Sequence, residues 1–300
     1  MRNRVAPARA GGLAGGAPPR ASRTGLYPIR AMLRRPGPLL GFLLLLLVVA
    51  LAVLAPFVSR YDPTRNNLLE SLEAPSAKHW MGTDLLGRDV FARVAYGARV
   101  SLSVAVAVQL VSVAIGTALG LAAGYFGGRV DDVVSALTTV VQAFPGLLFA
   151  IAVMAVLGPN LENVLIALAL VGWPTVARLV RGETLAVKEQ LFVEGARAVG
   201  AADVYIVLRH VLPNCLGPIV VVATLGLGGV VLSEATLSFL GLGIQPPMPS
   251  WGSMLAESRS RVVDAPWLMV FPGLAIFVTV LAFNLLGDGL RDALDPRLRE

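Results

Sequence analysis

Long runs of apolar residues separated by short polar segments dominate this chain. From Leu39 to Val58 there are twenty residues without a charge, mostly Leu and Val, bounded by Arg35 and Arg60. A helix of that length covers about 30 Å, the thickness of the hydrocarbon core of a bilayer. Leu, Val and Phe each favour insertion by roughly 0.3 to 0.6 kcal/mol. The pattern therefore predicts a first transmembrane helix here.

Five more apolar stretches follow, so we predict an all-α membrane protein with six transmembrane helices. They lie at about residues 100 to 124, 133 to 157, 164 to 180, 215 to 238 and 266 to 287. Prolines interrupt four of them, at Pro145, Pro174, Pro218 and Pro272. A proline frees a carbonyl that lipid cannot satisfy, so each should either face protein or a water-filled pathway, or kink a packed helix. Pro145 is the candidate gate or pathway residue among them.

A ridge of small residues runs along the second predicted span. Gly116, Gly120 and Gly124 recur every four residues and so share one face of a helix. Small residues at this spacing let another helix approach closely in a membrane. We expect helix packing here, and no direct role in transport.

Composition agrees with a lipid-embedded bundle. Of the 300 residues, 56% are hydrophobic and 15% charged, and mean hydropathy is +0.73; soluble domains carry about a quarter charged residues. Cys215 is the only cysteine, which excludes an intrachain disulfide or a cysteine-based metal site. We assign no metal ligands and no bound cofactor to the chain.

The charge distribution predicts the orientation in the membrane. The net charge of +6 reflects a tail, residues 1–36, with eight arginines and no acid. We read it as a disordered basic segment beside an anionic membrane surface, not as a nucleic-acid site. The tail and the loops 127–132, 181–214 and 288–300 together hold most of the Lys and Arg residues, and the positive-inside rule makes that side cytoplasmic. Both termini are then cytoplasmic in a multi-pass protein of the plasma (inner) membrane.

These features divide the chain into four parts. They are the cytoplasmic tail 1–36, the first helix with a long external loop 37–99, a five-helix core 100–287 that includes a cytoplasmic loop 181–214, and a cytoplasmic C-terminal tail 288–300.

The loop 181–214 is too long and too patterned for a simple connector. Leu185 to Val199 has helical spacing, Gly200 breaks it, Asp203 is an N-cap candidate, and Val204 to Leu212 continues to Pro213. The small residues Gly195, Ala196 and Ala198 leave the first helix a thin surface that another protein can approach. An ordinary interfacial amphipathic helix is the alternative.

Within this loop the sequence resembles the permease signature E-A-A-x3-G-x9-I-x-L-P of binding-protein-dependent ABC importers. The spacing is kept through Glu194, Ala196, Gly200, Leu212 and Pro213, while Gly195 replaces an Ala and His210 an Ile. Peptide-type permeases similarly read R-H-I-L-P-N at this place. The blocks HWMGTDLLGRD, GYFGGRVDD, LSFLGLG, PSWG and NLLGDGLRDALDPR also resemble that family.

The resemblance is to the second permease of dipeptide, oligopeptide, nickel and glutathione importers, with the type I permease fold. It implies that Glu194, Gly195, Ala196, Gly200, Ala201 and Asp203 form a coupling helix and turn that dock into an ATPase subunit. It also implies a homologous permease partner, two ATPases that use ATP and Mg²⁺, and an extracytoplasmic substrate-binding protein. Peptides are the expected cargo; nickel chelates, glutathione or another small solute remain alternatives.

Two polar features lie near the ends of predicted spans. Glu234, at the outer end of the fifth, is a candidate pathway residue, although pairing with Arg259 or Arg261 is the expected structural role. Trp251, in the last external loop, is a weaker gate candidate. Asp288, Asp292 and Asp295 alternate with Arg291 and Arg297, and we expect structural ion pairs there.

Other functional classes fit less well. A serine-type intramembrane hydrolase needs a general base within the bundle, but His79 and His210 both lie in predicted loops, and no H-E-x-x-H is present. An ion-coupled secondary transporter would show ionisable groups at mid-membrane and a repeated half-chain, and neither is evident. No nucleotide-binding G-x4-G-K-[ST] loop occurs, so an ATP-driven transporter would need its ATPase on another chain.

Overall fold

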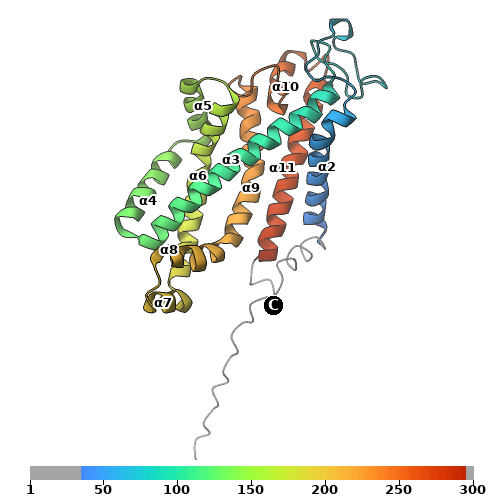
Figure 1. Ribbon diagram of the computed structural model, residues 1–300. Helices are drawn as coiled ribbons and strands as arrows, with labels where there is room; N and C mark the ends of the chain where they lie inside the picture. Colours follow the sequence, from blue (N-terminus) through green and yellow to red (C-terminus); the bar gives the residue numbers. More distant parts are fainter. Residues whose placement is uncertain (1–34, 295–300) are drawn as a thin grey trace, which may run out of the picture.

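The computed structural model describes residues 35–294, and in that range the chain is almost entirely helical (Figure 1). The described residues form no strand; Thr83 and Asp89 make an isolated bridge. Four helices are long and apolar enough to cross a membrane by themselves, and a fifth is formed by α8, a π-helical turn η2 and α9 in succession. The bounds are α2 Pro36–Val58, α3 Val90–Phe126, α6 Leu161–Lys188, α8 Asp203–Ile206, η2 Val207–Val211, α9 Leu212–Phe239 and α11 Trp267–Leu294.

The third predicted span is divided. Helices α4 (Gly128–Gln142) and α5 (Gly146–Leu157) meet at 86°. Pro145 is the N-cap of α5 and has no N–H to continue the hydrogen bonds of α4, so the break falls where the chain reaches it. Because α3 ends and α6 begins at opposite ends of the molecule (Figure 1), the pair α4–α5 together makes the sixth crossing.

Two predicted loops are shorter in the structure than the sequence indicated. The external loop was expected to reach residue 99, but α3 begins at Val90, where the Asp89 carboxylate caps it by accepting from the Ala92 N–H at 2.7 Å. The loop predicted from residue 181 begins only after Lys188, the end of α6. Charged side chains at helix ends made these spans look shorter than they are.

A buried ion network explains why α3 begins earlier in the sequence than predicted. Arg93 is buried on its first turns and pairs with Asp84 and Glu257, while Arg88 bonds Asp84 through Nε at 2.6 Å and Glu257 at 2.6 Å. Glu257 belongs to the short helix α10 (Trp251–Ser258), so the network joins the α2–α3 loop to α10. Because the two arginines and the two carboxylates pair with one another, the cost of removing these charges from water is offset.

The glycine ridge of α3 faces α6. A Cβ added to Gly116 would lie 2.7 Å from the Trp173 carbonyl oxygen, and one on Gly120 would lie 2.6 Å from that of Ala177. A Cβ on Gly124 would meet Thr184 at 2.6 Å. Real Cβ atoms essentially never approach other atoms this closely, so α3 and α6 are in contact backbone to backbone along the whole ridge.

The start of α2 and the end of α11 meet at one side of the bundle. Asp292, near the end of α11, pairs with Arg35 at the start of α2, and not with Arg291 as the alternating charges had suggested. The partner comes from the other end of the sequence, which no local spacing reveals. Asp295 and Arg297 and all but the last two residues of the predicted basic tail 1–36 lie outside the described residues.

The ridge makes a prediction about stability. Gly120→Ala should destabilise the protein in detergent by about 1 to 3 kcal/mol, because the new methyl group overpacks the contact with Ala177. Gly229→Ala is the matched control: its Cβ would meet no atom within 4 Å, and Ala favours the helix by about 1 kcal/mol. Thermal unfolding followed by size-exclusion chromatography should rank Gly229→Ala at or above the wild type and Gly120→Ala below it. Equal melting temperatures would contradict the packing account.

Candidate functional site

The most unusual surface lies at the end of the molecule opposite α10, where α7 (Leu191–Ala198) and α8 project beyond the long helices (Figure 1). We call residues 189–211 the tip. The chain leaves α6 at Lys188, turns through Glu189 and Gln190 into α7, turns again at Gly200 and continues as α8 into α9. The tip is therefore a helix–turn–helix, as predicted. Its first helix is α7, Leu191–Ala198, which is much shorter than the predicted helix from Leu185 to Val199.

Gly200 closes α7 in a Schellman motif. Its N–H donates to the Arg197 carbonyl at 3.0 Å, and the Ala201 N–H donates to the Ala196 carbonyl at 3.1 Å. Gly200 has φ of +82°, a backbone conformation that L side chains rarely adopt. The turn in the signature thus has a direct physical basis: glycine at this position satisfies the last carbonyls of α7 and directs the chain into α8.

Apolar side chains hold the underside of the tip against the bundle. Val193 of α7, Ile206 of α8 and Val211 of η2 are fully buried in one cluster with Tyr125, near the end of α3, and Cys215 at the start of α9. The tip is a defined surface on a packed base, not a free loop.

Polar contacts of Tyr125 also join the tip to α3. The Tyr125 hydroxyl donates to Asp203 Oδ1 at 2.7 Å, and the Arg197 guanidinium lies 5.7 Å from the centre of the Tyr125 ring. Asp203 is therefore not the N-cap that the sequence predicted; Ala202 has that position, and the Asp203 carboxylate faces α3 instead. Tyr125 was missed because its partner is 78 residues away.

A second polar contact supports the same end. Arg181 of α6 bonds both carboxylate oxygens of Asp131 in α4, with Nη2 to Oδ2 at 2.6 Å. Such a two-point pair holds guanidinium and carboxylate in one plane. It ties α4 to α6 about two helical turns before the tip begins.

The outer face of the tip is apolar and uncovered. Leu191 is 83% exposed and Val199 84%, and Val204, Tyr205 and Leu208 are exposed as well. Glu194 is exposed between them, and its carboxylate makes no hydrogen bond or ion pair with any residue between 35 and 294. A Cβ on Gly195 or Gly200 would meet open space. Exposed apolar groups around an unpaired charge are typical of a protein-docking surface.

One predicted helix end is wrong. Pro213 was expected to stop the helix that starts near Val204, but α8, η2 and α9 run on through it. Pro213 lies in the first turn of α9, where a missing N–H is tolerated. The π-helical turn just before it absorbs the change in hydrogen-bond pattern.

The three pathway candidates lie elsewhere and apart from the tip. Glu234 is fully buried, and its carboxylate accepts from Ser101 Oγ at 3.0 Å and Ser238 Oγ at 2.7 Å. The expected partners are wrong: Arg259 lies over the Phe239 ring, and Arg261 pairs with Asp264. The two serine hydroxyl groups that donate to Glu234 carry no charge, and no spacing in the sequence identifies them as its partners.

Trp251 and Pro145 remain predicted gate residues. Trp251 is fully buried at the start of α10, and its indole N–H donates to the Val94 carbonyl at 3.0 Å. The same ring lies against Gly97, where a Cβ would be 3.1 Å away. Pro145 is exposed at the α4–α5 bend. The structure thus gives Trp251 a packing contact with α3 and leaves Pro145 accessible.

Two family models match the chain. "Binding-protein-dependent transport system inner membrane component" covers residues 116–300, and "N-terminal TM domain of oligopeptide transport permease C" covers residues 29–75. The first match includes the tip, and the second includes α2 with part of the loop that follows it.

Curated relatives align with most of the chain. A glutathione transport system permease protein of Pectobacterium atrosepticum is 48% identical over 90% of each chain. A dipeptide transport system permease protein of Alkalihalophilus pseudofirmus is 45% identical over 87% of this chain and 86% of that one. The glutathione transport system permease protein of Escherichia coli is 49% identical over 86% and 85%.

A solved structure shares the fold. An inward-facing form of the MetNI methionine ABC transporter superposes with a TM-score of 0.55 and 20% identity, over 67% of this chain and 96% of that one. At this identity the likeness concerns the fold alone.

The hydrogen bond beneath the tip can be tested directly. Tyr125→Phe removes the donor to the Asp203 carboxylate but keeps the ring, and losing such a bond costs about 1.5 kcal/mol or more. Backbone amides of α8 should then exchange with deuterium roughly tenfold faster. Tyr205→Phe is the control, since the Tyr205 hydroxyl has no hydrogen-bond partner among residues 35–294. Similar exchange in both variants would show that the contact does not hold the tip.

Proposed function

Because the chain belongs to the family of binding-protein-dependent transport system inner membrane components, and is thus a permease subunit of an ABC importer, we propose that its tip couples peptide import to partner ATPases. It is a multi-pass protein of the inner membrane and not itself an enzyme, since ATP is hydrolysed by separate subunits in this family. Mg²⁺ and ATP then belong to those partners.

The uncovered face of the tip carries this proposal. Leu191, Val199 and Leu208 would be shielded from water by a groove on the ATPase, and Glu194 would find a polar or cationic partner at its edge. Each large apolar side chain buried on docking contributes about 1.5 to 3 kcal/mol before the costs of association. The small residues Gly195, Ala196 and Ala201 would let the ATPase surface come close to the backbone of the tip, as the resemblance to the signature implies.

A second permease would cover the long apolar faces. In the most apolar stretches of α2 and of the α8–α9 rod, 22% of residues are buried within this chain. Much of the remaining surface faces lipid or another subunit. We infer a heterodimer with a homologous permease, with the pathway at the shared face and an extracytoplasmic binding protein delivering substrate to the α2–α3 loop and α10. The tip and both termini are then cytoplasmic, in agreement with the charge distribution.

We propose peptides as the substrate, glutathione and dipeptides among them. The support is that relatives 45 to 49% identical over most of the chain are named for glutathione or dipeptide transport. Glutathione is itself a tripeptide, so one substrate class accommodates both names. Nickel chelates are the remaining alternative from the wider resemblance.

Transport would follow from movement of the tip. Closure of two ATPases on ATP would draw the paired tips together, and the permeases would open toward the binding protein; hydrolysis would reverse this. The chain supplies a firm connection for such a movement, because buried Val193 and Ile206 fasten the tip to α3 and α9. The equilibrium between the outward-open and the inward-open permease would shift because the closed ATPases bind the outward-open form more tightly than the inward-open form.

The proposal predicts uncoupling by substitutions in the tip. In the reconstituted complex, Glu194→Ala combined with Gly200→Val should lower substrate uptake roughly tenfold while the basal ATPase rate remains. Val at Gly200 must adopt φ near +82°, which is strained for a β-branched residue, and Ala at position 194 removes the unpaired charge. Uptake of labelled dipeptide or glutathione into vesicles, beside phosphate release, measures both quantities.

Gly195→Ala is the matched control. It restores the alanine that the signature has at this position, which is still small enough for close approach, and should leave uptake at the wild-type level with α7 slightly more stable. Unchanged uptake by a double mutant that inserts and assembles normally would refute the role of the tip.

A further inference from the structure

The loop between α2 and α3 is built around a buried histidine. His79 is 1% exposed; its Nδ1 lies 2.8 Å from Asp89 Oδ2 and its Nε2 lies 2.9 Å from Glu70 Oε2. Burial alone would lower the pKa of the imidazole, but the hydrogen bonds to Asp89 and Glu70 outweigh burial and raise that pKa above its usual value. The ring is thereby held at both nitrogens.

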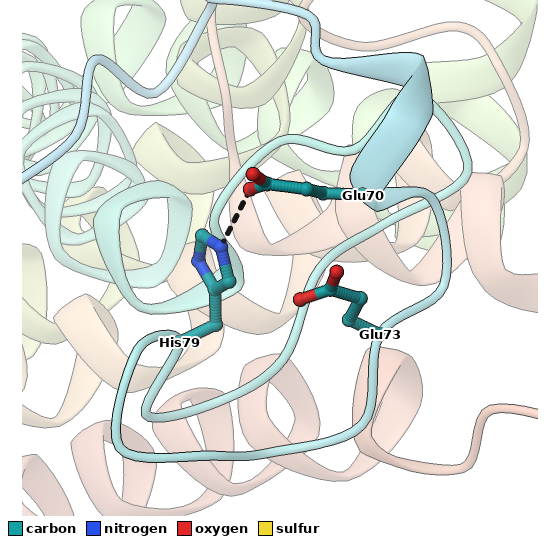
Figure 2. A group of neighbouring side chains, drawn as sticks. All are labelled: Glu70, Glu73 and His79. Atoms are coloured by element: carbon teal, nitrogen blue, oxygen red, sulfur yellow. Dashed lines mark hydrogen bonds and ion pairs between the residues drawn. The ribbon is translucent and has the colours of Figure 1, made fainter.

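A third side chain faces the same point. Figure 2 shows the carboxylates of Glu70 and Glu73 and the ring of His79 converging from three parts of the loop. One ligand atom from each residue lies within 4.8 Å of the others. Between residues 35 and 294 the Glu73 carboxylate has no hydrogen bond and no close ion pair, and only the more distant Lys78 ammonium interacts with it electrostatically, so its oxygens are available to a ligand.

Asp89 holds the histidine ring in the orientation that a metal-binding histidine needs, which a chance grouping of acidic residues would not provide. A metal-binding histidine almost always donates its second ring N–H to a carboxylate, which fixes the ring and its tautomer. Here Asp89 accepts from Nδ1 and is itself fixed, because its other oxygen caps α3 through the Ala92 N–H at 2.7 Å. The Nε2 of His79 is thus directed at the two glutamates by the start of a transmembrane helix.

We propose that Glu70, Glu73 and His79 bind a divalent transition-metal cation such as Zn²⁺. One imidazole and two carboxylates are ligands that Zn²⁺ accepts, with water completing a four-coordinate site. The cation replaces the proton on Nε2, which leaves to solvent, while the Nδ1 proton stays on the bond to Asp89. Lys78, now paired with Glu70 and half exposed, turns outward.

The bound cation would join three points of the loop. Glu70 lies in the short 3₁₀ helix η1 (Leu68–Glu70), Glu73 follows it, and His79 precedes the segment that leads to α3. Cross-linking them would make the loop more rigid in the folded protein, as any ligand that binds only the native state stabilises that state. This proposal is independent of the transport function.

The test is Zn²⁺ binding to the full chain in detergent, purified through a tag without histidine and stripped with chelator. Competition against a fluorescent chelator should reveal one Zn²⁺ per chain. Glu73→Gln should weaken binding at least roughly tenfold, and it should fold normally because Glu73 makes no side-chain bond within the described residues. Glu162→Gln removes the same charge from the exposed first turn of α6 and should bind as the wild type does.

Absorption at the zinc edge gives a second, independent readout. The chain has two histidines and one cysteine, so the proposed site predicts one imidazole with oxygen ligands and no sulfur. That signal should survive His210→Asn and be lost in His79→Asn. Equal affinity in wild type and Glu73→Gln, or a spectrum with sulfur or without imidazole, would overturn the proposal.

Discussion

The contact between α3 and α6 is the constraint on which the rest of the molecule depends. Because Gly116, Gly120 and Gly124 have no side chains, the backbone of α3 lies directly against the backbone carbonyls and the first side-chain atoms of α6. In lipid, helices gain little from the hydrophobic effect, so dispersion at this distance supplies much of their cohesion. The contact also sets the relative position of Tyr125 and Arg181, the two polar residues that support the tip.

The sequence predicted the features that depend on local pattern. Charge-free runs located the crossings, four-residue spacing located the glycine ridge, and the order of Glu194, Gly200 and Pro213 located the tip. Each rests on residues close together in the chain. Helix ends were less well predicted, because Arg93 looks like a loop residue until its pairs with Asp84 and Glu257 are seen. Asp89 looks like one too, although its carboxylate caps the first turn of α3.

Long-range partners account for what the sequence could not show. Glu234 is satisfied by Ser101 from a helix 133 residues earlier, Asp203 by Tyr125, and Asp292 by Arg35. Nothing in the sequence around a single hydroxyl group or arginine indicates which distant residue it will contact. The convergence of Glu70, Glu73 and His79 is similar, because it arises from the path of an irregular loop.

The unbroken run from Asp203 to Phe239 has a mechanical consequence. At about 1.5 Å per residue, this rod is roughly 55 Å long and reaches from one water phase to the other. One end of it belongs to the tip, and the other contains Glu234 and Ser238 beside α10. Because this helix is continuous and packs against α3 and α6, a sideways displacement of one end would be passed to the other without any unfolding in between.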